Sequence, residues 1–237
     1  FTCAGINVLE GYGLTETSPV IAVNDLTETG MKFATVGRVL KNVVVKIGED
    51  GEILCKGPCV MKGYYKDPET TRQAIDEEGW FHTGDLGRLE PEGHLKITGR
   101  KKELFKTSFG KYISPQPIED TFKESLFIDQ IVVVGEHQKF AGALIVPDFT
   151  FLRSYCAVKE IPYTTNAEVI SLPRIRKRFK TEVDRYNKLF GDTEKIKSWD
   201  LLDSEWTFES GEITPTLKLK RNVIAEKYKD KIAKLFA

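Results

Sequence analysis

The positions of apolar residues divide the chain into a strand-rich first part and a mixed second part. Residues 43–47 form a β-branched run, and residues 52–57 follow it after the Gly-containing segment 48–51. Two short runs around such a segment are typical of a hairpin. Together with the run Ala34–Leu40, they predict several short strands, which we interpret as a small barrel.

Residues 79–106 combine strand patterns with tight turns. Leu95 and Ile97 alternate with polar neighbours, which is the period of a half-buried strand. Gly84-Asp85 predicts a turn, and Glu90 to Gly93 predicts a type I turn with Pro at its second position. Short strands are expected in the first part of the chain at 6–10, 80–82, 86–90 and 94–98.

The second part of the chain mixes helical and strand patterns. Helices are expected at 115–124, 149–158, 173–189 and 222–236, where apolar residues recur at helical spacing or a Pro stands at the front. Strands are expected at 128–135, 143–146 and 196–202, with a hairpin at 104–113. The sequence therefore predicts an α+β fold, with a strand-rich barrel followed by a small mixed α/β domain. The polar strip 99–103 between two hairpins is the natural boundary.

Charge and cysteine content exclude several classes of function. The formal net charge is zero, which implies no bulk attraction to nucleic acid or anionic lipid. The four cysteines form no CxxC pair and the three histidines complete no zinc spacing, so we expect free thiols in the cytoplasm. No apolar run approaches the roughly 20 residues that span a bilayer.

Two stretches carry candidate chemistry. In the first, Gly13 beside Tyr12 allows close backbone approach to a ligand, and Thr15 and Glu16 offer a hydroxyl and a carboxylate to a hard cation such as Mg²⁺. In the second, Asp85 could accept two hydroxyl hydrogen bonds, as a ribose offers. Five cations then follow within twelve residues, a density that suits phosphate: Arg100, Lys101, Lys102, Lys106 and Lys111. An ordinary solvated hairpin is the alternative for this charge run.

A second basic zone lies in the expected helix 173–189. It has two interpretations, contact with acidic lipid or CoA phosphates, and an outward solvated face. The solvated face is the more ordinary interpretation of such a run. The first leaves peripheral contact with the inner face of the membrane open. The cations are Arg174, Arg176, Lys177, Arg178 and Lys180.

Four segments together resemble the adenylate-forming superfamily of acyl-CoA synthetases, NRPS adenylation domains and luciferases. They are YGLTE, GWFHTGDLG, GHLKITGRKKELFKTSFGKYISP and TPTLKLKR, and the last is similar to a motif of long-chain acyl-CoA synthetases. The resemblance runs over nearly the whole chain. It implies that Asp85 binds the ribose hydroxyls of ATP and that Arg100 also contacts the nucleotide. Lys106, in the same basic run, is a further candidate for nucleotide binding.

The resemblance assigns roles to the other candidates as well. Tyr12 would stack on adenine, Thr15 would touch the phosphates or the acyl carboxylate, and Glu16 would hold Mg²⁺. Lys218, the first lysine of TPTLKLKR, would enter the active site during adenylation. If the segment is extended, Lys218 shares one side with Thr216 and Lys220. Lys102 would be the hinge between residues 1–101, part of a large adenylation domain, and a mobile domain at 102–237.

The implied reaction activates a fatty acid with ATP and Mg²⁺ to an acyl-adenylate, from which the thiol of CoA displaces AMP. The chain opens on Phe1 in what reads as mid-domain, without the Ser/Thr/Gly-rich phosphate loop of the family. We therefore expect a piece of a longer enzyme that is inactive alone. Two further functions stay open, an acyl-AMP ligase that loads a carrier protein and a non-catalytic module.

Overall fold

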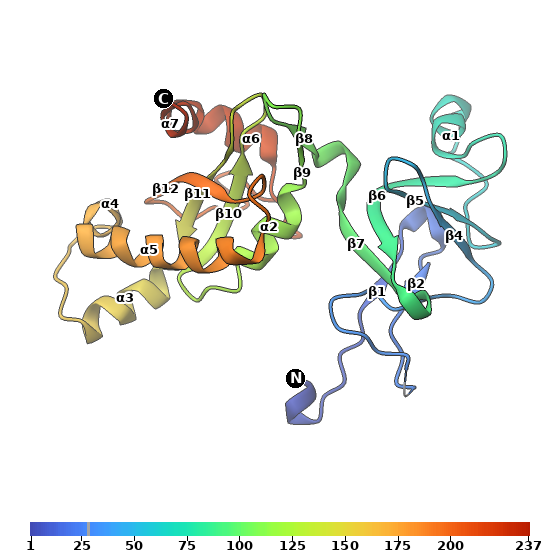
Figure 1. Cartoon of the computed structure of the whole chain (residues 1–237), viewed down its shortest axis with the longest axis horizontal. Coiled ribbons are helices and arrows are strands. Elements are labelled where there is room, and N and C mark those ends of the chain that lie inside the picture. The colour runs from blue at the N-terminus through green and yellow to red at the C-terminus, as the bar shows by residue number, and fades with distance from the viewer. Residues whose placement is uncertain (28) are drawn as a thin grey trace. The chain divides into compact units, whose positions relative to one another are not determined.

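The structure is a computed structural model that describes residues 1–27 and 29–237. The chain forms two compact units, Phe1–Lys102 and Glu103–Ala237. Figure 1 shows strands dominating the first unit and helices around a sheet in the second. The predicted α+β fold, with a strand-rich first part and a mixed second part, is confirmed.

A four-stranded antiparallel sheet with strands in sequence order forms the centre of the first unit. Its strands are β4 (Val44–Ile47), β5 (Glu52–Lys56), β6 (Phe81–Leu89) and β7 (Leu95–Arg100). The predicted turn at 48–51 is present, since Gly51 N donates to Gly48 O. Ile53, Cys55, Phe81 and Leu95 are buried beneath the sheet. The alternation at Leu95 and Ile97 thus places a half-buried strand as expected.

A smaller antiparallel sheet and one helix complete the first unit. The sheet contains β1 (Gly11–Tyr12), β2 (Ala22–Val23) and β3 (Arg38–Val39), and the helix is α1 (Pro68–Ala74). Asp67 caps this helix by accepting a hydrogen bond from Thr70 N. The strand predicted at 6–10 is wrong, because these residues are irregular and pairing begins at Gly11.

Strand β6 runs without a break through the predicted turn at Gly84-Asp85, so that prediction is wrong. The pairing with β5 shifts between His82 and Leu86, where β6 carries more residues than its partner. Gly84 has φ 71°, which lets the strand bulge instead of reversing. The bulge aims Asp85 into the unit, where it is buried.

The turn between β6 and β7 also differs from the prediction. Glu92, its third residue, has φ 73° and ψ 6°, the values of a type II turn and not of type I. Gly93 N donates to Glu90 O and closes the turn. Glu92 takes a position that usually favours Gly, which is why the sequence pattern misled.

The sheet of the second unit has the order β10-β11-β12, with the first pair antiparallel and the second parallel. The strands are β10 (Ile128–Val134), β11 (Ala141–Pro147) and β12 (Ile196–Leu201), close to their predicted positions. Every residue of β11 is buried, as expected of a strand covered on both faces. The separate hairpin of β8 (Phe105–Lys106) and β9 (Tyr112–Ile113) is confirmed.

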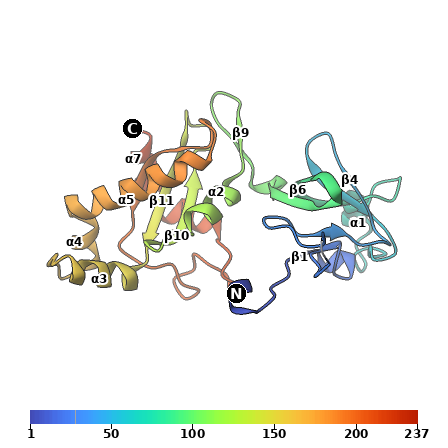
Figure 2. The same cartoon turned by 60° about the horizontal axis from the view of Figure 1, so that its bottom comes forward.

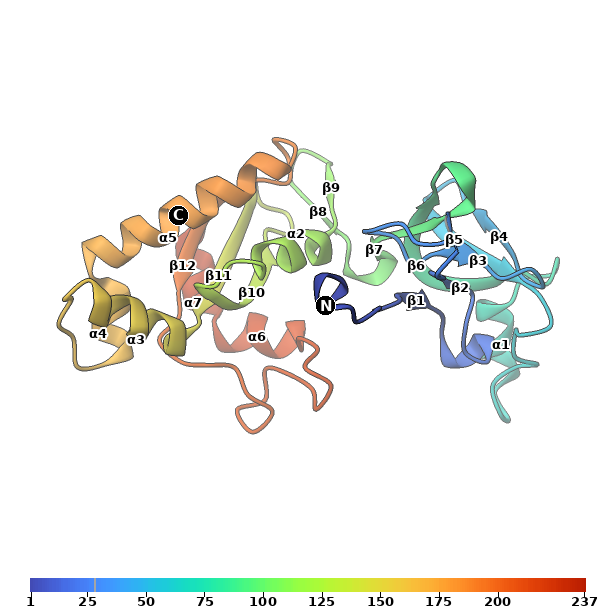
Figure 3. The same cartoon turned by 90° about the horizontal axis from the view of Figure 1, so that it is seen from below.

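Helices cover both faces of this sheet (Figures 1 and 3). The helix α2 (Pro115–Phe122) packs on β10 and contacts α5 (Pro173–Tyr186), while α7 (Lys229–Leu235) packs on β11 and β12 and contacts α6 (Arg221–Lys227). Figure 2 shows α3 (Phe149–Val158) and α4 (Asn166–Ser171) near the start of α5.

Four differences from the predicted helices were found. The helix α4 was not predicted, α2 ends at Phe122 and α5 ends at Tyr186. The helix predicted at 222–236 is two helices broken at Tyr228, whose φ of −110° is not helical.

Candidate nucleotide site

Three of the predicted nucleotide-binding residues meet in the first unit. The Tyr12 hydroxyl, at the end of β1, donates to Asp85 Oδ2 at 2.7 Å. Arg100, which pairs with Asp85 across β6 and β7, places its Nε 2.9 Å from Asp85 Oδ1. The Asp85 side chain is only 6% exposed, whereas that of Arg100 is 51% exposed. A buried carboxylate is thus held from two sides, with a cation at the surface beside it.

The bulge of β6 gives Asp85 its direction. Thr83 Oγ1 donates to Ile53 O at 2.7 Å and accepts from Asp85 N at 3.1 Å. The Thr83 hydroxyl thus links the backbone of β5 at Ile53 to the backbone of β6 at Asp85. Burial, reinforced by the Asp85 carboxylate, raises the pKa of the Tyr12 phenol well above its ordinary value. Tyr12 therefore stays protonated and remains a donor to Asp85.

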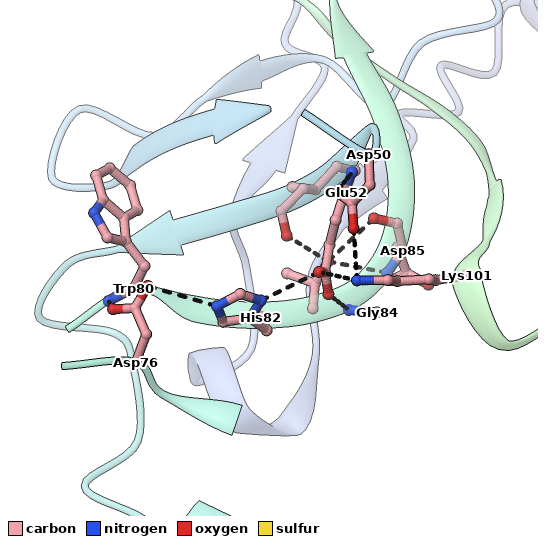
Figure 4. A network of polar contacts seen from close by, with 10 residues as sticks. Asp50, Glu52, Asp76, Trp80, His82, Gly84, Asp85 and Lys101 are labelled. Atoms are coloured by element: carbon pink, nitrogen blue, oxygen red, sulfur yellow. Dashed lines mark hydrogen bonds and ion pairs between the residues drawn. The ribbon is translucent and has the colours of Figure 1, made fainter. Parts of the chain in front are cut away.

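Glu52 at the start of β5 is a buried carboxylate that sequence reasoning missed, and Figure 4 shows its network. Its Oε1 accepts from Gly84 N at 2.9 Å, at the bulge beside Asp85. Its Oε2 lies 3.1 Å from His82 Nδ1 and 2.9 Å from Lys101 Nζ. Glu52 thereby connects β5, the bulge and the end of β7. The sequence did carry a signal for this residue, because Glu52 follows a predicted hairpin turn and precedes an apolar run.

Lys101 pairs with two carboxylates of the first unit. Besides Glu52 it contacts Asp50 Oδ2 at 2.7 Å, and these two partners raise the pKa of Lys101. Burial alone would raise the pKa of Glu52, but hydrogen bonds from Lys101, His82 and Gly84 outweigh burial and lower it. The predicted basic run is therefore not uniformly solvated, because Lys101 is tied to the β4–β5 hairpin.

The segment around Gly13 turns tightly on itself. A Cβ on Gly13 would lie 1.7 Å from Pro19 O, so only Gly fits there. The close backbone approach that the sequence predicts is thus an approach to the chain itself. Thr15 opens the 3₁₀ helix Thr15–Thr17 and is exposed.

The Glu16 side chain lies at the surface of this segment. Its Oε1 accepts from the Tyr64 hydroxyl at 3.0 Å, while its backbone O accepts from Met61 N at 2.8 Å. Burial, followed by this hydrogen bond, raises the pKa of Tyr64. No cluster of three or more His, Cys, Asp or Glu side chains suited to a metal was found among the described residues.

Lys102 is the last residue of the first unit and lies in the short 3₁₀ helix Lys101–Glu103. Its side chain is exposed. Lys106 belongs to the second unit, on β8, where its Nζ lies 5.5 Å from the centre of the Tyr112 ring. The structure thus does not bring Lys106 together with Asp85 in one unit.

Lys218 lies in a tight hairpin loop of the second unit, not in an extended strand. Thr214 N donates to Lys218 O at 2.8 Å, and Lys218 N donates to Thr214 Oγ1 at 3.0 Å. Leu217 has φ 59°, which reverses the chain, so Thr216, Lys218 and Lys220 do not share one side of a strand. Lys218 is exposed, and no ion pair to it exists in the part of the chain that the structure describes.

The basic run of α5 is largely paired within the second unit. Arg176 Nη1 lies 2.7 Å from Asp200 Oδ1, and Lys180 Nζ lies 2.6 Å from Asp184 Oδ2. Arg178 contacts the buried carboxylate of Glu182. These pairs favour the ordinary interpretation of a charged helix face. In the described parts of the chain, we find no helix with the length and apolarity needed to cross a bilayer.

Comparison with known proteins identifies two matching family models. The model described as AMP-binding enzyme matches residues 1–65, and that described as AMP-binding enzyme C-terminal domain matches residues 103–237. The chain is 36% identical over 236 residues to the long-chain-fatty-acid–CoA ligase FadD15 of Mycobacterium tuberculosis, covering 98% of this chain and 38% of that protein.

Two further comparisons extend this picture. The long-chain-fatty-acid–[acyl-carrier-protein] ligase AEE15 of Arabidopsis thaliana is 32% identical over 257 residues, covering all of this chain and 33% of that protein. The adenylation domain of a carboxylate reductase from Mycobacterium chelonae superposes with a TM-score of 0.75 at 23% identity, covering 96% of this chain and 34% of that chain, and shares the fold.

The chain spans between about a third and two fifths of the length of the curated relatives that it matches. The C-terminal-domain model alone covers more than half of the chain. The resemblance to adenylate-forming enzymes is therefore confirmed, and the chain belongs to the AMP-binding enzyme family.

Proposed function

We propose that the whole protein activates a long-chain fatty acid with ATP and transfers the acyl group to CoA. In the first half-reaction the fatty-acid carboxylate attacks the α-phosphate, which gives acyl-adenylate and pyrophosphate. In the second, the thiol of CoA attacks the acyl carbon and AMP leaves. The observation that carries the proposal is the contact of Tyr12, Asp85 and Arg100 in a member of the AMP-binding family.

The Asp85 carboxylate is suited to a ribose. Each of its oxygens accepts one hydrogen bond inside the protein and retains capacity for another. Two vicinal hydroxyls could therefore donate to it, and hydrogen bonds to a charged acceptor are the stronger kind. Arg100, half exposed at the same place, would contact the nucleotide. Tyr12 would present its ring to the adenine while its hydroxyl stays fixed on Asp85.

Thr15 and Glu16 are proposed to face the phosphates. Mg²⁺ prefers oxygen ligands and usually takes one or two carboxylates together with substrate phosphates and water. Glu16 fits that pattern, since Tyr64 occupies one of its oxygens and leaves the other to a cation. Mg²⁺ bound there would supply charge neutralisation at the phosphates. The exposed Thr15 hydroxyl would donate to a phosphate or to the acyl carboxylate.

Lys218 is proposed to serve the first half-reaction. Two anions meet when a carboxylate attacks a phosphate, so a cation that reaches the developing charge lowers the barrier. The exposed loop of Lys218 and its lack of a described ion-pair partner leave this ammonium available. Lys106 would offer a further cation to nucleotide or CoA.

The division of the chain into two compact units supports a domain boundary at Lys102. We propose that residues 1–101 belong to the adenylation domain and that 102–237 form a mobile domain, with Lys102 as the pivot. Rotation about the pivot after adenylation would withdraw Lys218 and admit CoA. Closure steps of this kind act through a few backbone dihedrals at the end of a segment.

A second candidate function has a carrier protein as the acyl acceptor. The observation that favours it is the likeness to AEE15, which is named as an acyl-carrier-protein ligase. Both candidates share the adenylation half-reaction and differ only in the thiol that receives the acyl group.

The test follows both half-reactions in the whole protein. Pyrophosphate exchange across a series of fatty acids reports adenylation, and thioester formation is then measured with CoA and with acyl carrier protein in parallel. We expect exchange that depends on a long-chain acid, and thioester with CoA. Preferred acylation of the carrier protein would establish the second candidate. Absence of fatty-acid-dependent exchange would refute both and favour a non-catalytic module.

A further inference from the structure

Arg221, at the first position of α6, sits between two carboxylates of the second unit. Its Nη1 and Nη2 donate to Glu119 Oε1 and Oε2 at 2.8 and 2.6 Å, and Nη2 also donates to Glu103 Oε2 at 3.3 Å. The fork of the guanidinium thus matches the two oxygens of Glu119. Such bidentate pairs fix orientation as well as distance.

Glu119 is a rigid partner because it is itself tied to the sheet. It lies on α2, is 3% exposed, and its Oε1 also accepts from Val133 N of β10 at 2.8 Å. Burial alone would lower the pKa of Arg221, but the carboxylates of Glu119 and Glu103 outweigh burial and raise it. The guanidinium therefore stays charged, and its contact with Glu119 links α2, β10 and the start of α6.

The loop that carries Lys218 ends directly before this contact. Two contacts close the base of the loop. Buried Ile213 pairs with Leu219, and Lys220 N donates to Glu212 O at 2.7 Å. Between these ties the side chains from Pro215 to Lys218 are exposed. The loop is thus a short exposed turn between two fixed ends, with buried Ile213 at one end and the Arg221 fork directly after the other.

The third contact of Arg221 reaches the segment after Lys102. Glu103 is the first residue of the second unit, so its contact ties the Lys218 loop to the place where that unit begins. Any motion of the chain at Lys102 would then move Glu103, Arg221 and the loop together.

We propose that Arg221 is a positioning residue for Lys218, holding the loop against Glu119 and Glu103 so that the ammonium arrives at a defined place during adenylation. The proposal rests on the function proposed above for Lys218. It assigns to Arg221 no contact with substrate.

The test uses Arg221→Lys and Glu119→Gln in the whole protein, each of which removes the charged fork and keeps a polar side chain. Pyrophosphate exchange should fall about tenfold in both, because misplacing a catalytic group by a small distance is costly. The KM for ATP and thioester formation from supplied acyl-adenylate should change less than about twofold. Arg178→Lys is the matched control, since Arg178 also pairs with a buried carboxylate of this unit, that of Glu182.

A double-mutant cycle separates positioning from general structure. If Arg221 acts through Lys218, adding Arg221→Lys to Lys218→Ala should lower exchange no further than Lys218→Ala alone. Multiplied losses, or equal losses in both half-reactions with an unchanged melting temperature, would overturn the proposal.

Limited trypsin digestion tests the loop without any ligase activity. Arg221→Lys and Arg178→Lys leave the number of trypsin sites unchanged. Only the former should accelerate cleavage after Lys218 and Lys220, by about tenfold if the loop opens locally. Unchanged cleavage would overturn the positioning role. Faster cleavage in a protein without adenylation would instead uphold the contact and refute the proposed function.

Discussion

At the scale of residues, one buried carboxylate organises the candidate site. Asp85 accepts from Tyr12 and lies against Arg100, and both partners come from other strands. The arrangement holds the carboxylate in a fixed orientation before any ligand arrives. Preorganisation of this kind reduces the free energy that ligand binding must spend on ordering the side chain.

Asp85→Ala in the whole protein should mainly weaken the use of ATP. Losing charge-assisted hydrogen bonds to a ribose should cost about 1.5–3 kcal/mol, or roughly one to two decades in kcat/KM for ATP. Steady-state kinetics with varied ATP measure this, with Tyr12→Phe as a milder control that leaves the carboxylate in place. Unchanged KM and kcat for ATP would reject the ribose assignment.

His94 allows a test of stability that does not depend on function. It is 1% exposed, and neither ring nitrogen has a hydrogen-bond partner among the described residues. An unpaired buried polar group costs about 1–3 kcal/mol, so His94→Phe should raise the free energy of unfolding by about 1 kcal/mol. Urea unfolding measures the change, and His94→Leu guards against overpacking. Destabilisation by both variants would show that the ring nitrogens have a partner, such as a buried water.

At the scale of elements, the bulge in β6 and the Glu52 network support each other. The positive φ of Gly84 exposes its N–H to Glu52, and Glu52 holds Lys101 at the end of β7. Strands β5 and β6 and the residue that follows β7 are thereby joined through one buried carboxylate. The network lies beside Asp85 in sequence and structure, and it holds the residue that precedes the proposed pivot.

This network predicts a pH dependence of stability. The pKa values of Asp50 and Glu52 lie below their ordinary 3.8 and 4.5, so their stabilisation is complete above these values and is lost as pH falls. The pKa of Lys101 lies above its ordinary 10.5, so its stabilisation is complete below that value and is lost as pH rises.

Urea unfolding of the chain between pH 3 and pH 7 should therefore show stability falling below about pH 4.5, and less steeply in Glu52→Gln. Asp192→Asn serves as the control, because Asp192 also has a lowered pKa but lies fully exposed beside Lys195. A wild-type profile that matches that of Glu52→Gln would contradict the role given to Glu52.

At the scale of the whole molecule, the chain divides into two compact units, and the boundary along the sequence falls after Lys102. Lys101 is tied to the first unit through Asp50 and Glu52, and Glu103 is tied to the second through Arg221. Lys102 lies between these two anchors. We therefore expect a change in its dihedrals to move whole units without disturbing either core.

Lys102→Pro in the whole protein should leave adenylation largely intact and slow thioester formation strongly. Proline locks φ near −65° and restricts the residue before it, so it should hinder the conformational change and not the nucleotide contacts. Pyrophosphate exchange and thioester production are measured on one preparation, with Lys102→Ala as the control that leaves the dihedrals free. Parallel loss of both activities in a folded protein, or retention of both, would show that the pivot lies elsewhere.

Local chemistry was enough to predict much of the fold. Propensity and turn geometry act over a few residues, so they can be read from a short stretch of sequence. Examples are the proline at the start of α2, the helical spacing of α5, the β-branched run of β10 and the glycines at 48–51. The alternation that places Leu95 in the core is equally local. The resemblance that identified the candidate site residues likewise depends on short motifs that can be read along the chain.

Contacts between distant residues decided what local patterns could not. The local sequence at Gly84 predicts a turn. Because β6 pairs with β5 on one side and β7 on the other, the strand continues past Gly84 and forms a bulge there. Tyr12 reaches Asp85 across 73 positions, and Arg221 reaches Glu119 across 102. The buried Glu52 carboxylate is paired by Lys101 and His82, which lie 49 and 30 positions away in the sequence. A buried charge is stable only where its partners converge, and that convergence is a property of the tertiary structure.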